Sequence, residues 1–364
     1  MTEINDKFLF KNVDGELKVI QKALEIAQLS GTGALVEEYE ASLSKFFSSK
    51  FSIAVSSGSA ALHSALYCLD VKPGDEVLIQ AIAPLPTILP VLTAGATPVF
   101  VDIGNGLAFD NEDLVSKINK KTKAAILAPL WGYPISYDEN LKILNEKGIP
   151  LIEDAAQAHG ARIGKRYIGT FGKVGCFSTH DRKLLSTGEG GFILTDDETL
   201  SVKLRKFTRL GSMNGVDYGV NYKISRLQAA LGSSRLSHME KNLEKKRIIA
   251  FEILKGIKGL GIKELGFPER SKPSYYSLVL ILPWGKERNL RFLEILDSKG
   301  ISSDRIKYGY DVAYNKPIFS NFKRKCKRSE KFIEDMATIP ITPVFTKEEI
   351  NYIIQSIRKA AHEI

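Results

Sequence analysis

Two short apolar runs, KAAILAP at residues 123–129 and GIPLIED at residues 148–154, decide the fold class of this chain. Each run is almost continuously apolar, which is typical of strands buried on both faces of a parallel sheet. The second run ends on Glu153 and Asp154, which puts carboxylates at the end of a buried strand. Open α/β sheets bind ligands outside the carboxyl ends of their strands. The two runs therefore predict a parallel sheet with a binding site at its edge.

Outward from these runs, the first three-fifths of the chain alternate β-rich runs with amphipathic stretches, as βαβ units do. The predicted helices are Ser59–Leu69, Asp110–Ile118 and Asp138–Glu146. We expect an α/β fold with a mostly parallel seven-stranded sheet flanked by helices, whose strands are Phe51–Val55, Glu76–Ile79, Pro98–Val101, Ala124–Ala128, Pro150–Glu153, Val174–Ser178 and Gly191–Thr195.

The pattern changes after residue 224. A long helical pattern runs from Ile224 to about Lys255, followed by a predicted strand at Tyr275–Leu282 and predicted helices at Glu287–Lys299 and Lys347–Ala361. A chain of 364 residues is long enough for two domains. We expect a large domain over residues 1–245 and a smaller C-terminal α+β domain over residues 246–364.

The charge balance favours anionic ligands. The formal net charge is +9, from 51 Lys and Arg against 42 Asp and Glu, and such an excess attracts anions through its long-range field. The densest basic run is KRKCKR at residues 323–328, but one short cluster without a recognised motif does not predict nucleic-acid binding. We expect an exposed loop or helix start there.

Cysteine usage and the amino terminus indicate a cytoplasmic protein. Cys68, Cys176 and Cys326 are far apart and lack metal-ligand spacing, so we expect neither disulfides nor a metal site. The first ten residues, MTEINDKFLF, lack the uninterrupted apolar stretch of a signal peptide. The uncharged stretch Val77–Val101 contains four prolines, which favour strand, short helix and strand over a membrane span.

Three segments carry candidate chemistry. The first, SSGSAA at residues 56–61, follows a strand and opens a helix, so its free N–H groups would face an incoming anion. A plain helix cap and tight turn explains the same residues.

The second segment, IEDAAQ at residues 152–157, places Asp154 at the sheet edge. A carboxylate there suits a cationic partner such as the protonated ring nitrogen of pyridoxal phosphate (PLP). The alternative for Asp154 is a helix N-cap.

The third segment, FSTHDRKLLSTGEGG at residues 177–191, sets Lys183 between a strand and a Gly-rich turn. A lysine that attacks an aldehyde must lose its proton, and nearby cations such as Arg182 or partial burial would lower its pKa. The alternative is a solvated surface lysine.

Together, in this order and spacing, the three segments resemble the DegT/DnrJ/EryC1/StrS sugar aminotransferases, which are PLP enzymes of fold type I. The resemblance covers nearly the whole chain. It is also carried by PGDEV at 73–77, GATPV at 95–99, GVNYK at 219–223 with QAA at 228–230, and IPITP at 339–343.

The resemblance implies roles around the cofactor ring. Lys183 matches the lysine that forms an imine with PLP and then moves the proton during transfer. Asp154 matches the carboxylate that pairs with the ring nitrogen, and Gln157 matches the amide beside the ring hydroxyl.

It also implies how the cofactor phosphate is bound. Gly58 and Ser59 match the phosphate-binding turn, and Ser178 matches a hydroxyl that reaches the phosphate. Asn221 matches an asparagine supplied by the neighbouring subunit, which implies a homodimer with shared active sites.

The implied reaction moves an amino group from glutamate or glutamine to a keto-sugar, expected as its nucleotide conjugate, by a ping-pong mechanism. Surface-polysaccharide or antibiotic-sugar biosynthesis is the implied pathway. Two alternatives stay open. One is a PLP-dependent keto-sugar dehydratase, although relatives with that activity typically lack the lysine, and the other is a non-catalytic binding protein on the same scaffold.

The chain departs from the family pattern at three places. Pro84 or Leu85 stands where relatives place an aromatic residue over the ring, so stacking is expected to be aliphatic or to come from elsewhere. Leu184 replaces a common asparagine, and SDRIKYGY at 303–310 replaces a histidine-containing motif that contacts the sugar, so the acceptor is expected to differ.

Three further side chains have two interpretations each. His180 is a candidate proton carrier or substrate ligand, because it lies three residues before Lys183, and it also suits the wall of the site. His159 is likewise a candidate proton carrier or sugar ligand, and Trp131 a candidate for the lining of the sugar pocket. For both we favour structural roles, His159 in the wall of the site and Trp131 in the core.

Overall fold

The structure is a computed structural model that describes residues 4, 15–26, 28–322 and 324–364. Most of the amino-terminal stretch MTEINDKFLF and Lys323 of the basic run lie outside the described residues. The predictions made on them therefore stay predictions.

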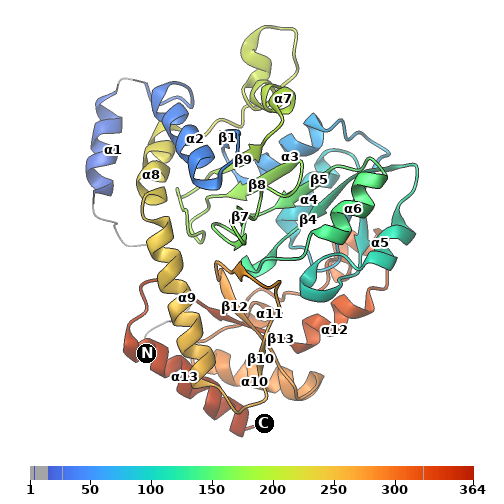
Figure 1. Ribbon diagram of the computed structural model, residues 1–364, viewed down its shortest axis with the longest axis vertical. Coiled ribbons are helices and arrows are strands. Elements are labelled where there is room, and N and C mark those ends of the chain that lie inside the picture. The colour runs from blue at the N-terminus through green and yellow to red at the C-terminus, as the bar shows by residue number, and fades with distance from the viewer. Residues whose placement is uncertain (1–3, 5–14, 27, 323) are drawn as a thin grey trace.

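A seven-stranded sheet forms the centre of the larger part of the molecule (Figure 1), as the sequence predicts. The strand order is β1-β9-β8-β5-β4-β2-β3. Only β9 of this sheet is reversed, because it pairs antiparallel with both β1 and β8 while the other neighbours pair in parallel. The strands are β1 (Phe51–Val55), β2 (Glu76–Gln80), β3 (Thr97–Val101), β4 (Thr122–Leu127), β5 (Leu151–Asp154), β8 (Val174–Ser178) and β9 (Gly191–Thr195).

Both faces of this sheet are covered. Successive side chains of a strand point to opposite faces, and consecutive residues of β2, β4, β5 and β9 are buried. The covering helices come from the same part of the chain and are α2 (Ala34–Phe47), α3 (Gly58–Cys68), α4 (Leu85–Thr93), α5 (Asn111–Lys117), α6 (Asp138–Glu146) and α7 (Glu198–Thr208). The uncharged stretch Val77–Val101 forms β2, α4 and β3, as predicted. Among the described residues, no helix has the length and apolar character needed to cross a membrane.

The predicted long helix after residue 224 is wrong in one respect. It is two helices, α8 (Arg226–Leu236) and α9 (Met239–Gly256). Ser237 Oγ donates to the carbonyl of Ser234 at 2.7 Å, and His238 Nδ1 lies 3.1 Å from the same oxygen. Side chains that occupy helix carbonyls in this way compete with the next turn. Helix α8 packs against α2 and against α1 (Glu16–Glu25).

The C-terminal part contains a second, three-stranded antiparallel sheet of order β10-β12-β13. Figure 1 shows α9 running from the region of α8 down to this part, so the predicted division at residue 245 falls inside α9. The elements are β10 (Lys263–Glu264), β12 (Ser277–Ile281), β13 (Met336–Pro340), α10 (Lys286–Ser298), α11 (Asp304–Lys307), α12 (Lys327–Asp335) and α13 (Lys347–His362). A third small sheet joins β11 (Ser271–Lys272) to β6 (Arg162–Ile163) and β7 (Arg166–Tyr167).

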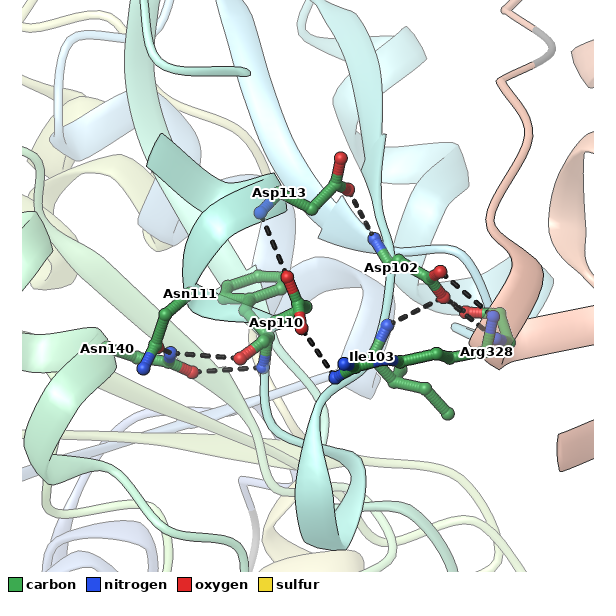
Figure 2. Close-up of polar contacts among 9 residues, drawn as sticks. Asp102, Ile103, Asp110, Asn111, Asp113, Asn140 and Arg328 are labelled. Atoms are coloured by element: carbon green, nitrogen blue, oxygen red, sulfur yellow. Dashed lines mark hydrogen bonds and ion pairs between the residues drawn. The ribbon is translucent and has the colours of Figure 1, made fainter. Parts of the chain in front are cut away.

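A network of carboxylates fixes α12 to the end of β3 (Figure 2). Asp102 accepts from the backbone N–H groups of Arg328 at 2.9 Å and Ser329 at 2.7 Å, and Arg328 also pairs with Asp110 at 2.6 Å. The amino end of a helix favours a negative charge, so Asp102 stabilises the start of α12. The described residues of the basic run, 324–328, therefore form a loop that leads into a helix start, and this helix end already binds a carboxylate of the same chain.

Candidate active site

The parallel strands of the large sheet end at one edge, and a cavity of about 350 Å³ opens there. Its lining comes from the residues that follow β1, β2, β4, β5 and β8. Of the predicted site residues, the cavity is lined by Gly58, Ser59, Asp154, Gln157, Ser178, His180 and Lys183. Segments up to 125 positions apart in the sequence thus converge, Gly58 and Lys183 being the outermost.

The start of α3 forms one end of the cavity. Ser57 caps the helix by accepting from the N–H of Ala60 at 3.0 Å. Within the described part of the chain, the N–H groups of Gly58 and Ser59 have no acceptor, as is usual for the first turn of a helix. A Cβ at position 58 would lie 2.7 Å from Cβ of Ser178, so only glycine allows this close approach. Two free donors and the Ser178 hydroxyl therefore face the same end, which suits a phosphate group.

Asp154 also lines the cavity and is the last residue of β5. It is 7% exposed, and burial raises the pKa of its carboxyl. The Thr87 hydroxyl and the Ala156 N–H donate to this carboxyl, and both hydrogen bonds lower its pKa in part. Thr87 comes from α4 and is itself buried. A cation placed against this carboxylate would favour its charged form.

The neighbouring Glu153 points to the other face of β5 and holds a loop. Its carboxylate accepts from the N–H groups of Gly169 at 2.8 Å and of Phe171 and Gly172 at 2.6 Å. The two adjacent carboxylates therefore differ in role: Glu153 is satisfied by the protein backbone, whereas Asp154 faces the cavity.

Gln157 is oriented by Trp131. The Trp131 backbone N–H donates to Gln157 Oε1 at 2.6 Å, which leaves the amide NH2 of Gln157 as the group available to a ligand. The indole N–H of Trp131 donates to Asp304 Oδ2 at 2.7 Å, so one residue connects the site to the C-terminal part. Trp131 is 1% exposed and is a core aromatic, as favoured from the sequence.

Lys183 is half-buried and its amine contacts an aromatic ring. Nζ lies 4.7 Å from the ring centroid of Tyr276, which directly precedes β12. Burial lowers the pKa of Lys183 to about 8, an effect that Asp154 and Asp304 oppose and Arg182 reinforces. A lysine with this pKa is partly neutral near pH 7.5 and can act as a nucleophile.

The two histidines differ in environment. His180 lines the cavity, is about half exposed, and its Nε2 lies 3.8 Å from a carboxylate oxygen of Glu189, which also lines the cavity. His159 is 2% exposed and packs edge-on against Phe177, and burial lowers its pKa to about 3. His159 is therefore a neutral residue of the wall behind the site, whereas His180 is placed to meet a ligand.

Asn221 is the one predicted site residue that the structure does not bring to the cavity. It is exposed and forms an isolated β-bridge with Arg209. Its place on the surface suits a residue that acts in a second subunit, and its role stays a prediction.

The wall where relatives carry an aromatic residue is aliphatic here. Pro84 and Pro86 line the cavity together with Leu62 and Leu130, whereas Leu85 is 41% exposed and lies outside the lining. The departure at Pro84 therefore leaves an apolar surface for a flat ring.

Sequence reasoning missed Thr87, Glu189, Tyr276 and Asp304. Glu189 lies within the Gly-rich motif, and Asp304 lies in the segment 303–310, which departs from the family pattern. The local sequence could therefore have indicated both as candidate site residues. Thr87 and Tyr276 carried no such local signal, because only the packing of α4 and of the C-terminal part brings them to Asp154 and Lys183.

The donor set fits PLP. A neutral cradle of N–H and hydroxyl groups suits the phosphate, a buried carboxylate suits a protonated ring nitrogen, and an amine of lowered pKa suits an aldehyde. Among the described residues, no cluster of three or more His, Cys, Asp or Glu side chains could hold a metal ion. The described cysteines are free and buried.

Comparisons with known proteins agree with this geometry. Residues 12–358 match the DegT/DnrJ/EryC1/StrS aminotransferase family. GDP-perosamine synthase of Escherichia coli O157:H7 is 28% identical over 352 residues, which cover 94% of this chain and 95% of the relative. The dTDP-3-amino-3,4,6-trideoxy-alpha-D-glucose transaminase of Streptomyces venezuelae is 29% identical, with 91% and 88% covered.

Solved structures show the same fold. DesV from S. venezuelae, crystallised in complex with a ketimine intermediate, superposes with a TM-score of 0.88 at 27% identity, covering 96% of this chain and 95% of that one. The aminotransferase from Psychrobacter cryohalolentis gives a TM-score of 0.88 at 25% identity, with 98% of both chains covered. The chain thus belongs to the DegT/DnrJ/EryC1/StrS aminotransferase family, as its three motif segments predicted.

Proposed function

We propose that this enzyme transfers an amino group from glutamate or glutamine to a nucleotide-linked keto-sugar by a ping-pong mechanism, with PLP held on Lys183. The observation that carries the proposal is the pairing, in one cavity, of a lysine of lowered pKa with the buried carboxylate of Asp154. When bound, PLP supplies an electron sink that accepts the electrons of the donor's bond to hydrogen.

The side chains of this chain divide the remaining work. Asp154 holds a proton on the ring nitrogen, and Thr87 keeps that carboxylate in place. Gln157 presents its NH2 to the ring hydroxyl because Trp131 occupies its oxygen. With PLP bound, Gly58, Ser59 and Ser178 would hold its phosphate, and Lys183 would accept and return the proton at the amino-bearing carbon.

The names of the relatives support a nucleotide-linked acceptor. The perosamine synthase is named for GDP, the S. venezuelae transaminase for dTDP, and an Acidithiobacillus ferrooxidans relative for UDP. The relatives also include a Bacillus subtilis spore coat polysaccharide biosynthesis protein, which supports a polysaccharide pathway. We place the enzyme in the cytoplasm, since three buried free cysteines suit a reducing compartment.

Replacing Lys183 with Ala tests the catalytic assignment. We expect Lys183→Ala to abolish amino transfer from glutamate to a nucleotide keto-sugar, because among the described residues no second lysine lines the cavity. Borohydride reduction of the PLP-loaded wild type, followed by peptide mass spectrometry, should find the pyridoxyl group on Lys183. Full activity of the variant would refute the role, and loss of water from the sugar without amination would favour the dehydratase.

We further propose a homodimer in which Asn221 completes the partner's phosphate site. Asn221 is exposed and lies outside its own cavity, and the adjacent loop exposes Met213, Val216 and Tyr218. Exposed apolar side chains gathered in one loop are typical of an interface.

Mixing two inactive variants tests the shared site. Lys183→Ala and Asn221→Ala should each be weakly active or inactive alone, and a reassociated equal mixture should recover about a quarter of wild-type activity. The reason is that half of the dimers are mixed and each mixed dimer has one intact site of two. No recovery in a mixture whose mixed dimers are verified by native mass spectrometry would contradict the proposal.

A further inference from the structure

Two cations converge on the exposed ring of Tyr308. The guanidinium carbon of Arg182 lies 5.3 Å from the ring centroid of Tyr308, and an Arg182 N–H donates to the Tyr308 hydroxyl. Lys307 Nζ lies 5.8 Å from the same centroid. All three residues are exposed, Tyr308 to 51%. We call Arg182, Lys307 and Tyr308 the Tyr308 cluster.

The positive charge of this cluster is not neutralised by an ion pair. No carboxylate within the described ranges forms an ion pair with Arg182 or Lys307, whereas Arg328 of the basic run pairs with Asp110 and Lys331 of α12 pairs with Asp335. Asp304 lines the same hollow and feels the charges of both cations, but one of its oxygens already accepts from the Trp131 indole. Two neighbouring cations at the surface repel each other, and an anion between them relieves that repulsion.

The cluster adjoins the reacting amine. Arg182 directly precedes Lys183 in the chain, and Tyr276, whose ring contacts Lys183 Nζ, lines one small hollow together with Arg182, Asp304, Lys307 and Tyr308. A ligand whose reacting carbon lies at Lys183 can therefore extend past Tyr276 to these cations. In a nucleotide sugar, the group next to the sugar ring is a diphosphate.

We propose that the Tyr308 cluster binds the diphosphate of the acceptor and so selects nucleotide-linked sugars over free sugars, an inference that rests on the proposed function. Arg182 presents the planar fork of donors that matches phosphate oxygens, and Lys307 adds a point charge. Tyr308 positions the Arg182 guanidinium before the acceptor binds. The Tyr308 hydroxyl accepts a hydrogen bond from Arg182, and the guanidinium lies over the Tyr308 ring.

Steady-state kinetics of charge-removing variants test the cluster. Arg182→Gln should raise the KM for a nucleotide keto-sugar roughly tenfold, as expected when a charge-assisted hydrogen bond is lost. Lys307→Gln should raise it about threefold, because an exposed lysine contributes less. In the Lys307 variant kcat should stay near the wild-type value. The matched control is Lys258→Gln, which removes the same charge from an exposed turn after α9 and should leave KM unchanged.

Calorimetric titration with inorganic pyrophosphate tests the same cluster without turnover. The PLP-loaded protein is used, so that the phosphate cradle at Gly58 is already filled. Pyrophosphate should bind the wild type and the Lys258 variant alike, and both cluster variants more weakly.

The outcomes separate the two proposals. An unchanged KM and unchanged pyrophosphate binding in both variants, in an enzyme that aminates nucleotide keto-sugars, would overturn this inference and leave the proposed function intact. A wild type that aminates no keto-sugar would overturn the proposed function, and pyrophosphate binding would still report on the cluster.

Discussion

The lowered pKa of Lys183 predicts a specific pH dependence for the covalent uptake of PLP. Only the neutral amine attacks an aldehyde. With a pKa of about 8, about 9% of the Lys183 amine is neutral at pH 7, against about 0.04% for a lysine with the usual pKa of about 10.4. The protein environment therefore makes roughly 230 times more neutral Lys183 amine available at that pH.

Stopped-flow mixing of the apoenzyme with PLP measures this effect. The rate of PLP uptake, followed by visible absorbance, should rise about tenfold per pH unit below pH 8 and level off above it, because the amine is then mostly neutral. A free lysine derivative measured in parallel should continue to rise to about pH 10. A tenfold rise per unit that persists in the enzyme through pH 10 would refute the reasoning.

Asp304→Asn sharpens the test. Asp304 raises the pKa of Lys183 by its charge, so its removal should shift the plateau to lower pH. Asparagine keeps an oxygen that can accept from the Trp131 indole, so the fold around the site is retained. A shift to higher pH would contradict the electrostatic argument.

Two further predictions concern packing and stability. Gly58→Ala should weaken PLP binding by about tenfold or more in a fluorescence titration. The reason is that the added Cβ meets Cβ of Ser178 at 2.7 Å and displaces the start of α3. An unchanged affinity would show that the helix adjusts freely. Lys246, in α9, is 5% exposed, and burial lowers its pKa to about 7. Between pH 7 and about 10.4 the unfolded chain therefore binds more protons than the folded chain. The free energy of unfolding should rise with pH over that window. Lys246→Met should remove this dependence and raise the free energy of unfolding at pH 7 by up to about 4 kcal/mol in urea titrations, and an equal slope in both proteins would contradict it.

The local sequence was sufficient to predict the strands of the large sheet. Strands buried on both faces must be apolar at nearly every position. Runs such as residues 123–129 and 148–154 can therefore be predicted as strands without knowing which strands lie beside them. The positions of Asp154, Ser178 and Lys183 follow from the same fact, since each lies at or just after the end of such a strand.

Helix boundaries and the C-terminal part were less predictable. The apolar pattern continues across Ser237 and His238, although their side chains bind the carbonyl of Ser234 and end α8. That competition depends on side-chain geometry, which periodicity does not contain.

The partners of the candidate site residues were decided only by the tertiary structure. Thr87 on α4 donates to Asp154 at the end of β5, and the ring of Tyr276 in the C-terminal part contacts the amine of Lys183. Burial at these contacts lowers the pKa of Lys183 and raises that of Asp154. The sequence alone determined which groups lie at the strand ends, because the apolar residues of a buried strand can be recognised locally in the sequence. Their protonation and orientation needed the fold, because desolvation and hydrogen bonding depend on side chains that are distant in the chain.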